Sequence, residues 1–472
     1  MSRFWEKSVC GFKSTMAEIN STSKEKSKSV FTLTDFSSRT VLTEKGQLDD
    51  YNPFEHRDQV NGASTSGSLA HLLKSSLGSG ILAMPMAFKN AGLLFGMVGT
   101  LVVGFLCTHC VHILVKTSHD ICEIAKVPHL GFAETAEKVF ENGPKKLRPW
   151  SNFAKQFVDG ALMATYYAAG CVYIVFVASS FQNVLNNELD LNWNIRVYIA
   201  IIIIPFLVMG QIRDLKYLVP FSAMANIFIV IVFGITLYYL FNEPLKFSDK
   251  PLFSSWAKLP LFFATVIFAM EGIGVVMPVE NSMKSPQHFL GCPGVLNTAM
   301  ITVVTLYAVI GFLGYVKYGD QVLGSITLNL DDGAWLADTA KLLMAISILF
   351  TFGLQFYVPN EILWRKISHK FPEEKHNIAQ ILLRTGIILL SGGISAAIPD
   401  LEPFIGLVGA VFFSLLGIMV PSVVQTVFLW PNNLGRWNWI LVKNVILSIL
   451  AILALIAGSF VSISEIIKMY SK

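Results

Sequence analysis

The chain begins with a polar stretch and continues as long apolar segments separated by short polar loops. Residues 1–66 hold nine Lys or Arg and nine Asp or Glu. They contain too few apolar residues to bury a core, so they are predicted to be a disordered cytosolic tail. Beyond this tail, eleven apolar segments reach or approach the roughly 17 to 25 residues that a membrane-spanning helix needs. They lie near 69–88, 93–115, 157–185, 197–212, 217–241, 259–279, 295–316, 342–363, 378–398, 404–429 and 440–463.

Two of these segments are interrupted. The first contains Leu-Gly-Ser-Gly at 77–80 followed by Pro85, and the sixth contains Glu-Gly-Ile-Gly at 271–274 followed by Pro278. Glycine costs about 1 kcal/mol and proline about 3 kcal/mol inside a helix, so both helices are expected to break. Matched breaks in the first and sixth helices are typical of transporters built from two inverted repeats. The alternative for either site alone is close helix packing through Gly-x-Gly.

The pattern therefore predicts an all-α integral membrane protein. Residues 67–472 form one domain with eleven transmembrane helices, arranged as a 5+5 inverted repeat with broken helices 1 and 6 and one additional helix at the end. Irregular backbone at membrane depth is tolerated only where it is buried in protein or lines a cavity. We therefore expect a binding site at the two breaks.

Composition and charge agree with a bilayer environment. Of the 472 residues, 53% are apolar and only 14% are charged, whereas soluble proteins carry about 25% charged residues. The net charge of +4 is dispersed, so nucleic acid is not an expected partner. Loops on the side of the tail hold 15 Lys and Arg, and the opposite loops hold 7. This asymmetry predicts a cytosolic N-terminus and an extracellular or lumenal C-terminus, in either the plasma membrane or a lysosomal or endosomal membrane.

The ends of broken helices predict the class of substrate. Free amides at the start of one half-helix carry partial positive charge, and free carbonyls at the end of another carry partial negative charge. Together they suit a zwitterion, with its carboxylate on the amides of 78–80 and its ammonium on the carbonyls of 270–272. Phe268 is a candidate aromatic lid, although plain packing is the commoner role. The candidate substrate-binding residues are Ser75, Gly78, Ser79, Gly80, Phe268, Met270, Glu271, Gly272 and Gly274.

Two ionisable residues are candidates for proton coupling. His71 lies two helical turns before Gly78 and on the same helix face, and histidine titrates near neutral pH when unperturbed. Its alternative is an interfacial position. Glu271 lies at the second break, where it either carries a proton or stabilises the unwound backbone by hydrogen bonding. Glu280, near the cytosolic end of the same segment, is expected to be interfacial.

Several classes of protein are disfavoured by the sequence. The run Cys-Thr-His-Cys-Val-His at 107–112 lies on one helix, where its side chains point around the cylinder and cannot close a tetrahedral metal site. Nucleotide-binding, metalloprotease and serine-hydrolase motifs are missing from the sequence. We therefore expect no enzyme activity, no cofactor and no bound metal. Energy for transport would come from a gradient, or the flux would be passive.

Two longer motifs give a resemblance to a known family. His-Leu-Leu-Lys at 71–74, Leu-Gly-Ser-Gly-Ile-Leu-Ala-Met-Pro at 77–85 and Lys-Asn-Ala-Gly at 89–92 resemble the proton-coupled amino acid transporters of the amino acid/auxin permease group. Glu-Gly-Ile-Gly-Val-Val-Met-Pro-Val-Glu-Asn-Ser-Met-Lys at 271–284 is similar to the same family at the sixth helix. The resemblance covers the chain from about residue 50 onward.

The resemblance implies a LeuT-like fold and symport of protons with small neutral amino acids such as glycine, alanine and proline. It also implies that His71 takes part in proton coupling. The chain departs from some relatives because its loops at 186–196 and 317–341 contain no cysteine. Two other functions stay open: an amino-acid sensor that signals through its cytosolic tail, and a facilitator that works without protons.

Overall fold

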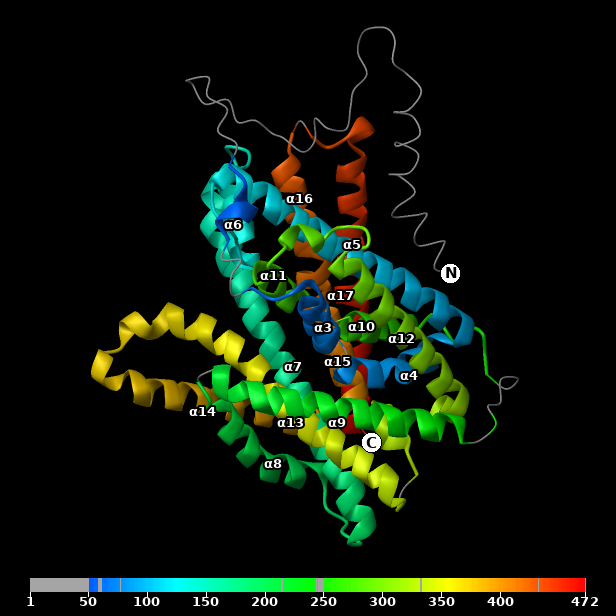
Figure 1. Ribbon diagram of the computed structural model, residues 1–472. Helices are drawn as coiled ribbons and strands as arrows, with labels where there is room; N and C mark the ends of the chain where they lie inside the picture. Colours follow the sequence, from blue (N-terminus) through cyan, green and yellow to red (C-terminus); the bar gives the residue numbers. More distant parts are fainter. Residues whose placement is uncertain are drawn as a thin grey trace, which may run out of the picture.

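The computed structural model describes residues 51–57, 62–76, 78–213, 215–242, 244, 250–270, 272–331, 333–431 and 433–471. Over these residues the regular structure is helical, apart from one isolated bridge between Ala63 and Met283 (Figure 1). Most of the predicted tail lies outside the described residues. The part of it that is described includes the short 3-10 helix η2 (Pro53–His56).

The long helices follow the predicted apolar segments closely. In chain order they are α3 (Thr65–Ser76), α4 (Ser79–Ala91), α5 (Leu93–Ala125), α7 (Ser151–Glu188), α8 (Ile195–Gly210), α9 (Leu215–Phe241), α10 (Leu259–Ala269), α11 (Ile273–Asn281), α12 (Val295–Tyr318), α13 (Trp335–Ile367), α14 (His376–Ala397), α15 (Leu401–Val408), α16 (Val420–Leu429) and α17 (Trp439–Ser471). Two π-helical turns, Gly409–Phe413 and Leu415–Met419, join α15 to α16. A shorter amphipathic helix, α6 (Phe132–Asn142), lies in the loop after α5.

Nine helices in the described part of the chain are long and apolar enough to cross a membrane. The helix α8 is apolar but has only 16 residues. The first predicted segment is present as two halves of 12 and 13 residues, α3 and α4. The all-α membrane fold class is thus confirmed, whereas the count of eleven spans stays a prediction.

Both predicted helix breaks are present. The first helix stops at Ser76 and resumes at Ser79, and the sixth stops at Ala269 and resumes at Ile273. Neither α4 nor α11 has a side-chain cap at its start, where Gly78 and Gly272 stand. Main-chain amides at these starts therefore have no intrahelical acceptor. The matched breaks agree with the LeuT-like class predicted from the sequence.

The two broken helices lie in the centre of the molecule (Figure 1). Helix α4 packs against α10 and α12, and α10 also packs against α15 and the first π-helical turn. Helix α13 packs against α7 and α9. The halves α4 and α10 approach closely, because a Cβ atom on Gly80 would lie 2.7 Å from the Cα of Ala269. This packing holds the two breaks beside each other.

Candidate functional site

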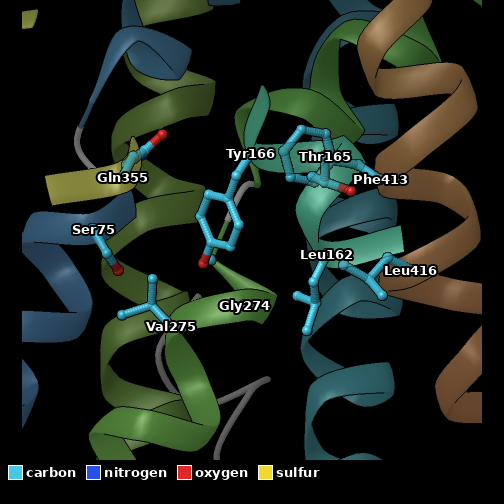
Figure 2. A pocket seen from close by; sticks show the side chains of 10 residues that line it. Ser75, Leu162, Thr165, Tyr166, Gly274, Val275, Gln355, Phe413 and Leu416 are labelled. Atoms are coloured by element: carbon cyan, nitrogen blue, oxygen red, sulfur yellow. The ribbon is translucent and has the colours of Figure 1, made fainter. Parts of the chain in front are cut away.

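A small pocket lies beside the sixth-helix break, between elements far apart in the sequence (Figure 2). Its volume is about 20 Å³, which is room for about one water molecule. We call it the central pocket. A substrate larger than water therefore enters only when the wall moves. The residues that line it are Ser75, Leu162, Thr165, Tyr166, Gly272, Gly274, Val275, Gln355, Phe413 and Leu416.

The described residues that line the central pocket are uncharged and present mainly apolar surface, with polar groups that include those of Ser75, Thr165 and Gln355. The Ser75 hydroxyl donates to the carbonyl of Leu72 at 2.9 Å, and the Thr165 hydroxyl donates to the carbonyl of Ala161 at 2.7 Å. Both oxygens can still accept a hydrogen bond. The Oε1 atom of Gln355 is buried and has no hydrogen-bond partner among the described residues. The pocket thus offers several acceptors to a donor group.

Gly274 and Tyr166 form the tightest part of the wall. In Figure 2 the hydroxyl of Tyr166 points toward Gly274 on α11. A Cβ atom on Gly274 would lie 2.4 Å from that hydroxyl oxygen, closer than any van der Waals contact allows. The glycine is therefore required by this approach, and it brings the first amides of α11 to the pocket.

Of the predicted substrate-binding residues, three line the pocket: Ser75, Gly272 and Gly274. Ser79 and Gly80 are buried at the start of α4, outside the pocket lining. Gly78 is the N-cap of α4, and a Cβ there would meet no atom within 4 Å.

The remaining candidates lie around the second break. Phe268 is fully buried and contacts Phe413 edge-on, with ring centroids 5.7 Å apart. It therefore stands behind the pocket wall, with Phe413 in front of it. Met270 is buried at the end of α10. Glu271 lies outside the described residues.

His71 is exposed on α3, one turn before the pocket-lining Ser75. Residues four apart share a helix face, so the imidazole and the Ser75 hydroxyl lie on the same side of α3. This face leads from the predicted cytosolic end of the helix to the central pocket.

Tyr307 lies between the two helix breaks and was not predicted from the sequence. It lies on α12 and is fully buried. Its hydroxyl is within hydrogen-bond distance of the carbonyl of Ser76, at the end of α3, and of the carbonyl of Ala269, 2.8 Å away at the end of α10. The one phenolic proton can be donated to either carbonyl, so Tyr307 links the two free helix ends. No local pattern marks this tyrosine, since it lies within an ordinary apolar segment.

A buried ionic cluster closes the predicted cytosolic end of α11. One carboxylate oxygen of Glu280 lies 2.7 Å from Nη1 of Arg57 and 2.7 Å from Nε2 of His119. The Arg57 Nε atom also donates to the carbonyl of Pro128 at 2.7 Å. The Glu280 side chain is fully buried in the protein, and its expected position at the membrane interface stays a prediction. A buried carboxylate needs such partners to offset its desolvation.

The segment that precedes α3 forms hydrogen bonds to the residues that follow α11. The amide of Ala63 donates to the carbonyl of Ser282 at 2.7 Å, and the amide of Lys284 donates to the carbonyl of Ala63 at 2.9 Å. The ring of Phe54 meets the His119 ring edge-on at 5.0 Å. The described N-terminal residues therefore contact both the end of α11 and α5.

These features define a membrane transporter class: two broken helices at the centre of an all-α protein, with a small pocket between them. The chain belongs to the family of transmembrane amino acid transporter proteins, whose model matches residues 61–464. Its members are transporters and not enzymes, as the sequence predicted.

Two curated relatives match over most of their length. The chain is 40% identical over 424 residues to the proton-coupled amino acid transporter-like protein pathetic of Drosophila melanogaster, covering 89% of each chain. It is 24% identical over 414 residues to the probable amino acid transporter skat-1 of Caenorhabditis elegans, covering 85% of this chain and 90% of the relative. The crystal structure of MhsT in complex with L-phenylalanine matches 84% of this chain and 99% of that chain, with 14% identity and a TM-score of 0.45.

Proposed function

We propose that the protein is a secondary active transporter that moves small neutral amino acids, such as glycine, alanine and proline, together with protons. The observation that carries this proposal is the central pocket, which is small, lies at the helix break and is uncharged among its described lining residues. The Drosophila relative, 40% identical, is named a proton-coupled amino acid transporter-like protein, which supports proton coupling here. We further propose a plasma membrane or lysosomal or endosomal location, with a cytosolic N-terminus.

The arrangement of groups suggests how a zwitterion would bind. Amides at the start of α11, from Gly272 onward, carry partial positive charge and suit a carboxylate. The unpartnered Oε1 atom of Gln355 and the hydroxyl of Ser75 suit an ammonium group. Walls formed by Tyr166, Phe413 and Leu416 leave little room for a side chain, so small substrates are favoured.

Transport requires the wall to open toward each side of the membrane in turn. We propose that the cytosolic opening separates Arg57 and His119 from Glu280 and that His71 exchanges the coupled proton on the path to Ser75. Glu271 is a second candidate for the proton. In this account substrate and proton enter from the extracellular or lumenal side and leave to the cytosol.

Gln355→Leu tests the substrate geometry. It removes the acceptor assigned to the ammonium group while keeping a side chain of similar size. A hydrogen bond to a charged group contributes about 1.5–3 kcal/mol, so we expect the KM for labelled alanine uptake to rise at least about tenfold. Uptake into proteoliposomes measures this change directly.

Gln355→Glu is the matched control for that experiment. It keeps an oxygen acceptor at the same position and is expected to retain more affinity for alanine than the leucine variant. If both variants show the wild-type KM, Gln355 does not contact the substrate and the proposed binding geometry is incorrect.

A further inference from the structure

One face of α5 changes from apolar to basic along its length. Its exposed apolar residues are between 45% and 58% exposed and recur every three or four positions, as Leu94, Val98, Val102 and Phe105. The same spacing continues through His109, His112 and the exposed Lys116. Residues at this spacing share one helix face. The face is thus apolar over most of the membrane depth and cationic at its predicted cytosolic end.

A second helix adds a cation to this end. The Nζ atom of Lys443, on α17, lies 2.9 Å from Nε2 of His109 and 3.0 Å from Oε1 of Gln425. His112 is within electrostatic reach of both Lys116 and Lys443. We call His109, His112, Lys116 and Lys443 the basic cluster.

The basic cluster lacks a counter-ion in the part of the chain that the structure describes. Neither Lys116 nor Lys443 lies in an ion pair with a carboxylate there. An ammonium group has three donors, and the contacts of Lys443 to His109 and Gln425 use two of them. The two ammonium groups of Lys116 and Lys443, in no ion pair among the described residues, suit an anionic ligand.

Tryptophans place the cluster at the membrane boundary. Trp437 and Trp439 are strongly exposed at the start of α17, and the Nζ atom of Lys443 lies 5.8 Å from the centroid of the Trp439 ring. Exposed tryptophan prefers the interface between lipid and water. Beyond it, α17 presents exposed apolar residues at Val442, Ile446 and Ile449. Lys116 follows the predicted span and Lys443 lies one turn inside Trp439, so both long side chains can reach headgroup depth beside apolar faces of two helices.

We propose that this place is a binding site for an anionic phospholipid. The basic cluster holds the headgroup phosphate, and an acyl chain lies along the apolar face of α5 from Phe105 toward Leu94. Basic pockets between membrane helices on the cytosolic side bind such headgroups. In the orientation proposed above, the site faces the cytosolic leaflet, which carries most anionic lipid. The site is separate from the central pocket.

Native mass spectrometry of the full-length protein in detergent tests this proposal. Dioleoyl phosphatidylserine and dioleoyl phosphatidylcholine are added in turn, and the fraction of protein with one bound lipid is measured against lipid concentration. The variants are Lys116→Gln and Lys116→Gln/Lys443→Gln. The matched control is Lys258→Gln, which removes an exposed lysine at the start of α10. Circular dichroism verifies that each variant is folded.

We expect the unmodified protein to bind phosphatidylserine more tightly than phosphatidylcholine. From the binding free energy that one basic residue near anionic lipid contributes, removing Lys116 should lower the affinity for phosphatidylserine about fivefold. Removing both lysines should lower it about thirtyfold. Lys258→Gln is expected to bind as the unmodified protein does. Lys116 is exposed, so its single variant should fold even if the loss of Lys443 disturbs the contacts to His109 and Gln425.

Three results would overturn the assignment. The first is equal affinity for the two lipids, and the second is an equal effect of Lys116→Gln and Lys258→Gln. The third is full competition by glycerophosphoserine, the headgroup without acyl chains, at the same concentration as the lipid. That result would show that the apolar face of α5 takes no part. Since the assay measures no transport, its outcome is independent of the proposed symport.

Discussion

Gly274→Ala is expected to reduce amino acid uptake by at least about tenfold while the protein still reaches the membrane. The added Cβ atom would lie 2.4 Å from the hydroxyl oxygen of Tyr166 and 3.0 Å from its Cζ atom. Overpacking of this kind costs about 1–3 kcal/mol, and here it displaces the start of α11 from the central pocket. Labelled uptake, normalised to the amount of protein at the membrane, measures the effect.

Two further variants make this prediction specific. Gly160→Ala makes the same chemical change on α7, where a Cβ meets no atom within 4 Å, and should transport normally. Tyr166→Phe removes the clashing oxygen but keeps the ring carbon at 3.0 Å, so Gly274→Ala/Tyr166→Phe should recover part of the uptake that Gly274→Ala loses. Normal uptake by Gly274→Ala, or the absence of any recovery in the double variant, would contradict the proposed wall of the pocket.

Glu280→Gln is expected to have the largest effect on stability. It leaves the Arg57 guanidinium, only 3% exposed, without its anionic partner. Removing one member of a buried ion pair costs about 3–5 kcal/mol. We therefore expect a clear fall in the thermal unfolding temperature of the purified protein, together with reduced uptake, because this pair stabilises the proposed cytosolic end of α11.

A double-mutant cycle separates the ion pair from general damage. Arg57→Met/Glu280→Gln removes both charges and should be less destabilised than the sum of the two single variants. Glu465→Gln, which breaks the exposed pair with Lys468, should change the unfolding temperature little, because exposed pairs contribute about 0–1 kcal/mol. Additive losses in the cycle would mean that Arg57 and Glu280 do not depend on each other.

The fold could be predicted from the sequence because its strongest constraints are local. Both breaks occur at the predicted glycines of the first and sixth segments, whereas Pro85 and Pro278 lie inside α4 and α11. Segment length alone was a weaker guide to the number of membrane spans. The 16 residues of α8 and the two halves of the first helix each fall short of a full span by length alone.

The candidate site was only partly predictable, because its side chains meet through tertiary packing. Ser75, Gly272 and Gly274 belong to the broken helices and were found from that pattern. Tyr166 and Gln355 come from α7 and α13, and nothing in their neighbouring sequence distinguishes them from other polar residues in apolar helices.

The buried position of Glu280 was also not predictable. Its partners Arg57 and His119 are 223 and 161 residues away in the chain. The spacing of residues within a short segment gives no information on contacts between residues so far apart in the chain.

The most direct test of the proposed symport is a recording of membrane current in cells that express the protein at their surface. Glycine, alanine or proline is added at about pH 5.5 and about pH 7.5 without sodium, and His71→Ala is recorded beside the unmodified protein. The account predicts an inward current that is larger at the acidic pH and is lost in the variant. Uptake of labelled alanine without current and without pH dependence would contradict it and would favour facilitation or sensing.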